Sequence, residues 1–474
     1  MPLPIPYLPA LLLLLSELSE LLLVSPRIRL LESSICRTHY GLPSVPEAEC
    51  KIPDVQRRLA YIRGWQVFFE ATPVMALAIP WGALADRVGR KKVLAVNFVG
   101  CAIHIAWFAL VCNPGSNIAI EWVWASALAF VLGGGPRTAG ILILALVNDV
   151  SPGAERSERF YYTYSAFLVT ELVALPLASV LMQKSIMLPF VIALLSLGCC
   201  FPVLGMIKGR RAQGQLRTSG DEATAGLLET TTGEDNGVAT TAGSKKPWTL
   251  RVLLQDLWKV VADIDASTAL VLLGHFICPV RQELVFQILI PYTSKRFELP
   301  IANAGLLLSV VAFTNLAIFI SVLPYITRRL RRTLSPSRID TLTASYSSLL
   351  LALGSLMIGF AGTFPLLVVS TITFSAGFGI RLGLLSLLTA LVDPAKIGRA
   401  YTLVTVVESF GEMTSAPMLQ GLWSWGLLQG GVWRGTPWWA GAVVYLAGWW
   451  WIERVRVKGE RRRVGSVVET RPLL

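Results

Sequence analysis

The sequence predicts an all-α integral membrane protein with about twelve transmembrane helices arranged as two six-helix bundles. Of the 474 residues, 54% are hydrophobic and only 15% are charged, whereas a soluble domain carries about 25% charged residues. Apolar runs of about 20 residues, the length of a helix that crosses a bilayer, recur along the chain. These runs fall into two groups of six, which a polar segment separates.

The N-terminal bundle, residues 1–208, and the C-terminal bundle, residues 264–453, each contain six predicted spans. The spans are predicted at residues 6–27, 62–84, 92–112, 122–147, 159–182, 186–207, 266–292, 302–327, 340–361, 364–392, 397–423 and 436–452. Residues 28–61 are predicted as the first outside loop. No basic residue precedes the first apolar run, which favours a membrane helix over a secretory signal.

The polar segment between the bundles, residues 209–247, is rich in Gly, Thr, Ala and acidic residues and predicts a disordered cytoplasmic linker. Residues 248–263 alternate apolar and charged side chains at helical spacing. They predict an interfacial amphipathic helix or, as the alternative, a solvated helix packed on the protein. Residues 454–474 form a predicted basic cytoplasmic tail.

Positive charge predicts the orientation rather than a nucleic-acid partner. The net charge is +12, but the Lys and Arg residues lie in short clusters between apolar spans. If both termini are cytoplasmic, 28 of the 42 Lys and Arg residues fall in or beside inside segments and 11 in outside segments. This bias follows the positive-inside rule. The first outside loop, which holds seven basic residues when the flanking Arg27 and Arg63 are counted with it, is the main exception.

One motif lies between the second and third predicted spans. Residues 82–94 read GALADRVGRKKVL, the pattern G-x-L-x-D-R-x-G-R-K-x-x-L. This pattern resembles the signature loop of the major facilitator superfamily. Its defining positions are Gly82, Asp86, Arg87, Gly89, Arg90 and Lys91.

The residue types of the motif have a physical meaning at these positions. Gly82 would let two helices approach closely, and Gly89 would allow a tight reversal. The resemblance implies that the loop is a conformational latch that holds the outward-facing state. The resemblance also implies that Asp86 meets the start of the eleventh span near Gly398. It further implies that Arg90 reaches Asp149 at the inner end of the fourth span. A simple positive-inside turn is the alternative.

A narrower resemblance covers most of the chain. The segments ICRTHY at 35–40, YTSKRF at 292–297 and VESFG at 407–411 resemble a group of fungal facilitators that is often linked with export of drugs or secondary metabolites. The exporter pattern G-x-x-x-G-P-x-x-G-G is missing from the fifth span, which weakens the case for proton-driven antiport. The sugar-porter signatures PESPR and PETKG are missing as well. Residues 155–162 resemble a peptide-transporter signature, but at the wrong place in the chain.

Charged side chains inside the predicted spans are the candidates for substrate or proton handling, because a charge in the bilayer needs a cavity or a partner. Glu408 and Glu412 lie one helical turn apart, so their carboxylates share one face in a manner that suits proton exchange. Arg137 follows the breakable stretch GGGP, and broken helices line transporter sites. Structural pairing between helices is the alternative for each candidate. The candidates are Glu17, Glu20, Arg137, Glu171, Arg281, Glu283, Arg381, Glu408 and Glu412.

Two of the seven cysteines, Cys36 and Cys50, lie in the predicted first loop. They would form a disulfide if that loop faces an oxidising compartment and would otherwise be free thiols. No spacing typical of a metal site occurs, and the chain has only three His residues. We therefore expect no metal and no cofactor.

The expected function is secondary active transport of a small organic solute by alternating access, with proton-coupled export of a hydrophobic or amphipathic compound as the first hypothesis. Uptake of a nutrient, such as a sugar or another small polar solute, and a non-transporting sensor on the same fold are the alternatives. An enzyme is not predicted, because neither H-E-x-x-H nor G-x-S-x-G occurs. We expect a monomer in the plasma or vacuolar membrane, with the lipid bilayer, the solute and protons as its partners.

Overall fold

The computed structural model describes residues 7–150, 156–207, 265–392 and 397–455. These ranges are helices and short connections, without a strand. The predicted linker at 209–247, the predicted interfacial helix at 248–263 and the predicted tail beyond residue 455 lie outside the described residues.

The N-terminal half begins with two helices in succession and contains two 3₁₀ segments. Its elements are α1 (Leu8–Leu21), α2 (Val24–Tyr40), η2 (Glu47–Lys51), α3 (Pro53–Val88), α4 (Arg90–Val111), η3 (Ile120–Val131), α5 (Gly135–Val150), α6 (Arg156–Lys184) and α7 (Leu188–Met206).

The C-terminal half has more interruptions, because π-helical turns divide two of its spans and a 3₁₀ turn divides a third. Its elements are α9 (Ala266–Gln282), η6 (Glu283–Ile288), α10 (Leu289–Arg296), α11 (Ile301–Gly305), α12 (Leu307–Ala317), η7 (Ile318–Val322), α13 (Leu323–Leu330), α14 (Pro336–Phe360), α15 (Phe364–Ser375), η8 (Ala376–Gly379), α16 (Ile380–Leu391), α17 (Ile397–Gln429), η10 (Gly431–Gly435) and α18 (Thr436–Ile452).

The described helices account for each of the twelve predicted spans. Within the described ranges, nine helical segments are long and apolar enough to cross a membrane by length and composition. The other three predicted spans correspond to α3, α17 and α18. Helices α3 and α17 pack along each other at the boundary between the halves, where Arg63, Glu408 and Glu412 contact protein groups. This contact explains their lower hydropathy.

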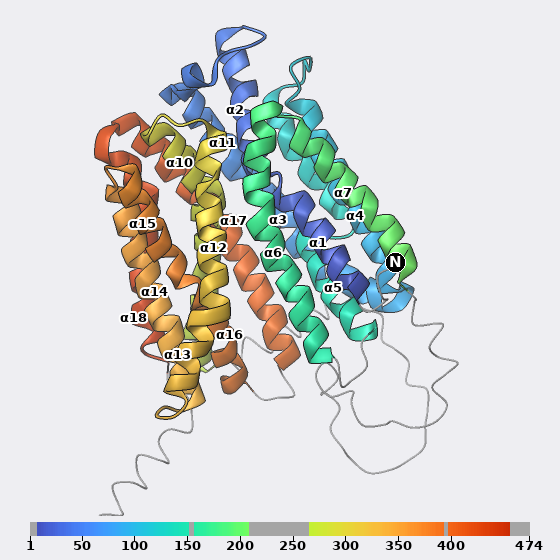
Figure 1. The fold of residues 1–474 in the computed structure, drawn as a ribbon, viewed down its shortest axis with the longest axis vertical. Coiled ribbons are helices and arrows are strands. Elements are labelled where there is room, and N and C mark those ends of the chain that lie inside the picture. Colours follow the sequence, from blue (N-terminus) through green and yellow to red (C-terminus); the bar gives the residue numbers. More distant parts are fainter. Residues whose placement is uncertain (1–6, 151–155, 208–264, 393–396, 456–474) are drawn as a thin grey trace, which may run out of the picture.

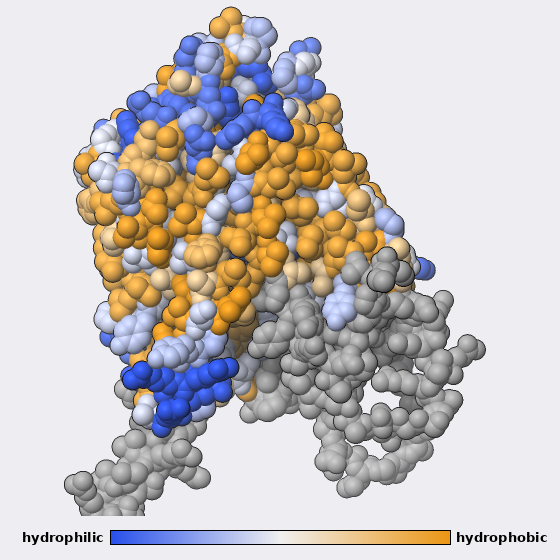
Figure 2. Space-filling model, viewed as in Figure 1, coloured by the Kyte–Doolittle hydropathy of each residue, from blue (hydrophilic) through white to orange (hydrophobic). Residues whose placement is uncertain are grey.

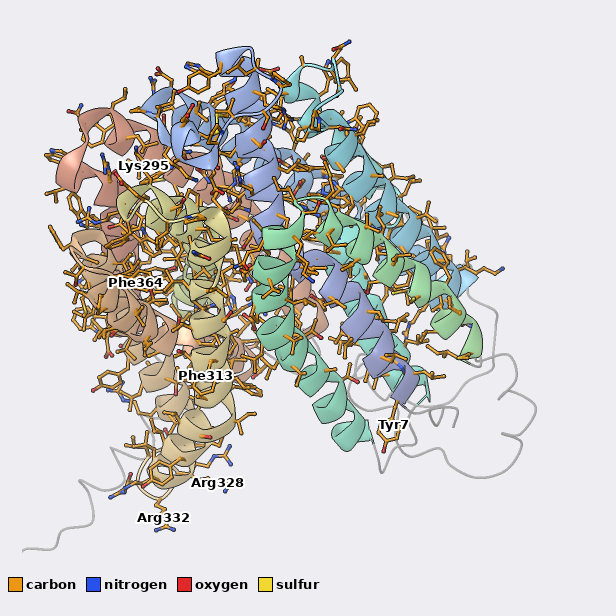
Figure 3. The ribbon with its side chains drawn as sticks, turned by 45° about the horizontal axis from the view of Figure 1, so that its top comes forward. Tyr7, Lys295, Phe313, Arg328, Arg332 and Phe364 are labelled. Carbon is orange, nitrogen blue, oxygen red and sulfur yellow. A yellow bond between two sulfur atoms is a disulfide. The ribbon has the colours of Figure 1, made fainter. Side chains whose placement is uncertain are left out.

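The molecule has a hydrophobic belt with polar ends, as expected for a protein that crosses a bilayer. In Figure 2 the belt is orange, and hydrophilic residues gather at both ends. Helices α6 and α12 run side by side, while the lower ends of α6 and α13 point apart in Figures 1 and 3. The end that carries residues 82–94 is called the signature end below, and the opposite end, which carries Cys36 and Cys50, is called the disulfide end.

The first span is longer than the sequence predicts. The predicted loop at 28–61 is largely helical, because α2 continues to Tyr40 and α3 begins at Pro53. The basic residues that suggested a loop have partners on the protein: Arg29 Nη1 lies 3.1 Å from Glu32 Oε2, and Arg37 Nη2 donates to the carbonyl of Cys112 at 2.9 Å. A helix can therefore carry these charges beyond the apolar run.

Candidate functional site

A break in the fourth span positions the first residue of the site. Gly133, Gly134 and Gly135 all have positive φ, at 85°, 84° and 74°, a conformation that glycine adopts without steric cost. The side chain of Asn97 on α4 fits against this turn and donates to the carbonyls of Gly133 at 2.7 Å and Gly135 at 2.8 Å. Helix α5 begins here, and the turn places Arg137 at its first turn.

Arg137 forms an ion pair between the two halves. Its Nη2 lies 2.7 Å from Glu412 Oε1 on α17. Glu283, the first residue of the π-helical turn η6, lies within electrostatic range of both groups. Glu283 is 4% exposed, and its Oε2 has no hydrogen-bond partner among the described residues. The two halves therefore share a charged cluster in the middle of the bundle.

Glu408 is held inside the C-terminal half. Its Oε1 accepts from Arg381 Nε at 2.8 Å, its Oε2 accepts from Arg381 Nη2 at 2.9 Å, and His275 Nδ1 lies 2.9 Å from Oε1. The expectation that Glu408 and Glu412 exchange protons as a pair of like charges stays a prediction. Each carboxylate has its own cationic partner, because different helices pack against successive turns of α17.

A second polar connection joins the halves through Asn315 on α12. Asn315 Oδ1 accepts from Arg281 Nη2 at 2.8 Å, and Asn315 Nδ2 donates to Glu171 Oε1 on α6 at 3.5 Å. The guanidinium of Arg281 also lies over the ring of Phe378, 5.1 Å from its centroid. Arg281 and Glu283 have separate surroundings, as their spacing of two residues requires.

The N-terminal half contains its own buried polar group. Arg27 Nη2 lies 3.4 Å from Glu20 Oε2, and Glu70 accepts from Gln66 at 2.8 Å. His104 Nε2 lies 3.5 Å from the same Glu70 oxygen.

Glu17 belongs to the α5 face of α1. Its Oε1 lies 3.9 Å from the position that a Cβ on Gly140 would take. Among the described residues Glu17 forms no ion pair with the groups on α3 and α4, so it is not part of the Glu70 group.

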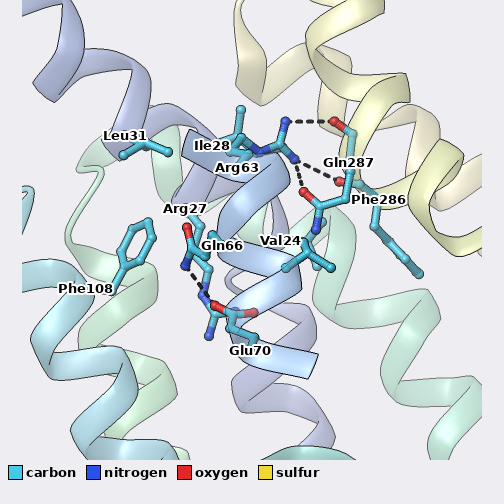
Figure 4. A pocket seen from close by; sticks show the side chains of 11 residues that line it. Val24, Arg27, Ile28, Leu31, Arg63, Gln66, Glu70, Phe108, Phe286 and Gln287 are labelled. Carbon is cyan, nitrogen blue, oxygen red and sulfur yellow. Dashed lines mark hydrogen bonds between the residues drawn. The ribbon is translucent and has the colours of Figure 1, made fainter. Parts of the chain in front are cut away.

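A small cavity of about 90 Å³ lies beside this group (Figure 4). Arg27, Gln66 and Glu70 line it from the N-terminal half. Arg63 closes it toward the C-terminal half, where it donates to the carbonyl of Gln287 at 2.7 Å and to the Gln287 side chain. The cavity is thus bounded by polar groups of both halves.

The disulfide end is closed by contacts between the halves. A disulfide joins Cys36 to Cys50, with their Cα atoms 5.4 Å apart, and fixes η2 against α2. Glu47 Oε1 on η2 accepts from the Ile301 amide at 2.7 Å, and Lys295 Nζ donates to the carbonyl of Lys51. Residues of η2 therefore bind the first turn of α11 and the end of α10.

The signature end shows a different arrangement. Gly89 has a φ of 102° and reverses the chain between α3 and α4. Arg90 Nη1 donates to the carbonyl of Ala145 near the end of α5 at 2.6 Å, and Lys91 Nζ donates to the carbonyl of Ile207 at 2.5 Å. Arg87 is exposed. These contacts stay within the N-terminal half.

Two expectations for the signature segment can be compared with the structure. A Cβ on Gly82 would meet no described atom within 4 Å, so the described residues show no close approach of helices at Gly82 in this conformation. The side chains of Asp86 and Asp149 lie outside the described residues, and their implied contacts stay predictions.

Several residues that complete the site lack a distinctive pattern in the sequence. His275, Asn315 and Gln287 each contact a charged candidate from another helix. The sequence predicts Arg27 at the end of the first span. In the structure it lies within the helical segment Leu8–Tyr40 and pairs with Glu20. A polar residue within an apolar run was the available signal, but its partner depends on helix packing.

The described residues contain no group of three or more His, Cys, Asp or Glu side chains that could hold a metal ion. The chemistry available is that of charge pairs and hydrogen bonds on the surface where two helical bundles meet. Such an arrangement defines a polytopic membrane carrier, whose halves can change their contacts without covalent chemistry.

Comparison with known proteins agrees with this class. Residues 63–416 match the model of the Major Facilitator Superfamily. The efflux pump atnC of Emericella nidulans is 30% identical over 429 residues, which cover 87% of this chain and 80% of that protein. The transporter aprT of Aspergillus flavus is 29% identical over 428 residues, with the same coverage. The chain belongs to the Major Facilitator Superfamily.

The fold is shared with solved transporters of the superfamily. A D-xylose–proton symporter matches with a TM-score of 0.64 at 14% identity, over 95% of this chain and 97% of that protein. The likeness confirms the predicted fold of two six-helix bundles.

Proposed function

We propose that this transporter exports a hydrophobic or amphipathic organic compound by alternating access, with protons as the coupling ion. The observation that carries the proposal is the Arg137–Glu412 ion pair, which lies on the surface along which the halves must separate. The direction is supported by relatives that are named as efflux pumps.

The proposed orientation places the signature end in the cytoplasm and the disulfide end outside the cytoplasm or in the vacuolar lumen. The Cys36–Cys50 disulfide supports it, because disulfides persist in oxidising compartments. The structure, with contacts between the halves at the disulfide end and spread helices at the signature end, then corresponds to an inward-facing state.

We assign the coupling role to Glu412 rather than Glu408. The cationic partner of Glu412 is on the opposite half, so a rearrangement of the halves can remove it. Both partners of Glu408, Arg381 and His275, lie on its own half and move with it. Only the carboxylate that loses its partner during the cycle changes its affinity for a proton.

The test is flux in liposomes that contain the purified full-length chain and a pH-sensitive dye. A panel of lipophilic compounds and sugars would be added, and solute and proton movement measured together. We expect proton movement that depends on a lipophilic compound and is lost in Glu412→Gln, whereas Glu408→Gln retains coupling at a reduced rate. Arg58→Gln, at an exposed ion pair with Glu121, is the control.

Each other outcome would change one part of the proposal. Sugar flux without lipophile flux would favour nutrient uptake. Solute flux without proton movement would remove the coupling role from Glu412. A folded protein without any flux would count against transport of the compounds in the panel and favour a sensor.

A further inference from the structure

We propose that the solute binds through an anionic group, such as a carboxylate, held by the guanidinium groups of Arg137 and Arg381. The inference names the substrate class of the proposed transporter and rests on the proposed function only in taking the space between the halves as the solute site. Two ion pairs carry it, each between one arginine and a glutamate on one of two successive turns of α17.

The first step is that the two arginines are neighbours. Glu408 and Glu412 are four residues apart on α17, and residues at that spacing lie on the same helix face. Arg381 binds Glu408 from α16, and Arg137 binds Glu412 from α5 in the other half. The two guanidinium groups therefore lie next to consecutive turns of one helix, on the boundary between the halves.

The second step is that the cations, not the carboxylates, face the open space. The side chains of Arg381 and Arg137 are 59% and 42% exposed, whereas those of Glu408 and Glu412 are 13% and 18% exposed. Glu283 and Glu171, the other acidic residues nearby, are buried. Acidic groups are numerous here, but a solute that enters between the halves meets the guanidinium groups first.

The third step is that donors remain for a ligand. A guanidinium has five N–H groups. The ion pair of Arg137 with Glu412 engages Nη2, so Arg137 supplies the donors, whereas Arg381, whose Nε and Nη2 bind Glu408, supplies mainly its positive charge. Planar carboxylates accept two parallel N–H bonds from one arginine. A carboxylate between Arg137 and Arg381 would thus contact both halves at once, and its apolar part would extend along the apolar side chains of the bundle.

The experiment compares three ligands with the same ring: 2-naphthylacetate, 2-naphthylacetamide and 2-(2-naphthyl)ethylammonium. Their binding to the full-length chain in lipid nanodiscs would be measured by equilibrium dialysis. We expect the carboxylate to bind about tenfold more tightly than the amide, because hydrogen bonds to charged groups are the stronger ones. The ammonium should bind most weakly.

Three variants test the assignment. Arg381→Lys keeps the charge but loses the planar fork, so the preference for the carboxylate should fall but persist. Arg137→Gln alone leaves Glu412 without its partner and destabilises the fold. The double variant Arg137→Gln/Glu412→Gln removes both charges and is therefore the decisive one. It should lose most of the preference. Arg58→Gln, far from the site, should keep it.

Equal binding of the three ligands, a preference for the ammonium, or an unchanged preference in the double variant would overturn the inference. Flux of the amide in liposomes separates this result from the proposed function. If the amide is transported while the carboxylate is not preferred, export of amphipathic compounds stands and the anion site falls. If the carboxylate binds through Arg137 but neither compound is transported, the anion site stands and export falls.

Discussion

Arg137 on α5 and Glu412 on α17 form an ion pair of 2.7 Å that joins the two halves of the transporter. The glycine turn at Gly133–Gly135 fixes the arginine, and the packing of α17 along α3 fixes the glutamate. The pair therefore couples a local break in one helix to the contact between two bundles.

We expect Arg137 and Glu412 to be energetically coupled. A double-mutant cycle with Arg137→Gln and Glu412→Gln, measured by thermal unfolding in detergent, should give a coupling energy of about 0.5–3 kcal/mol, as for other residues in one charged network. Additive effects would show that the pair contributes nothing. The same cycle on Arg58 and Glu121, an exposed pair, should give less, since surface ion pairs contribute about 0–1 kcal/mol.

Gly64→Leu should shift the transporter toward a state that is open at the disulfide end. A Cβ at Gly64 on α3 would lie 3.1 Å from Pro417 Cα and 3.1 Å from Gln420 Cβ on α17. The larger leucine would push the halves apart where they now touch. Distances between spin labels on η2 and α11 would measure the shift.

Gly198→Leu is the control for this variant, because a Cβ on Gly198 meets no atom within 4 Å. If both leucine variants gave the wild-type distance distribution, the α3–α17 contact at Gly64 would not limit opening.

The fold was predictable from the sequence because a membrane span is recognised by the length and apolarity of its residues. The predicted order of twelve spans matches the described helices. The sequence does not predict the length of α2, because charged residues favoured a loop after residue 27. In the structure Arg29 and Arg37 lie on the helix and bind Glu32 and the Cys112 carbonyl.

The site was predictable only as a set of residue types. Charge inside an apolar run marks Arg137, Arg381 and Glu412, and the structure brings each into an ion pair. Their partners depend on which helices cross at a given height. The pairing of Glu408 with His275 joins residues 133 positions apart and leaves no periodic signal in the chain.

Removal of the disulfide should destabilise the disulfide end. Cys36 and Cys50 are 14 residues apart, and a loop of this length gives a disulfide a contribution of about 3 kcal/mol in the chain-entropy model. Thermal unfolding of Cys36→Ala/Cys50→Ala should show the loss, and flux should slow because η2 no longer positions Glu47 against Ile301.

Two other cysteines serve as references for the disulfide variant. Cys199 is exposed and free, so Cys199→Ala should leave the unfolding temperature unchanged. Burial raises the pKa of the Cys112 thiol to about 12, so it stays protonated at neutral pH and does not attack the disulfide. If the double alanine variant unfolded like the wild type, η2 would be held by its ion pairs alone.

Asn315 gives a prediction that separates its two contacts. Its amide accepts from Arg281 and donates to Glu171. Asn315→Leu removes both contacts and leaves two buried charges without this partner, so it should lower the unfolding free energy by about 1.5–3 kcal/mol. Asn303→Leu, at an exposed position on α11, should have little effect.

Asn315→Asp should behave differently, because the new carboxylate would pair with Arg281 but lie beside Glu171, whose Oε1 is 3.5 Å from the present amide nitrogen. Two carboxylates this close repel unless one binds a proton. The variant should therefore gain stability relative to the wild type as the pH is lowered. Unfolding curves between about pH 8 and pH 5, roughly the range in which such a proton binds, would show this gain. If the difference in stability between the variant and the wild type did not change with pH, Arg281 alone would neutralise both carboxylates. The polar connection between α6 and α12 would then depend on Arg281 rather than on Asn315.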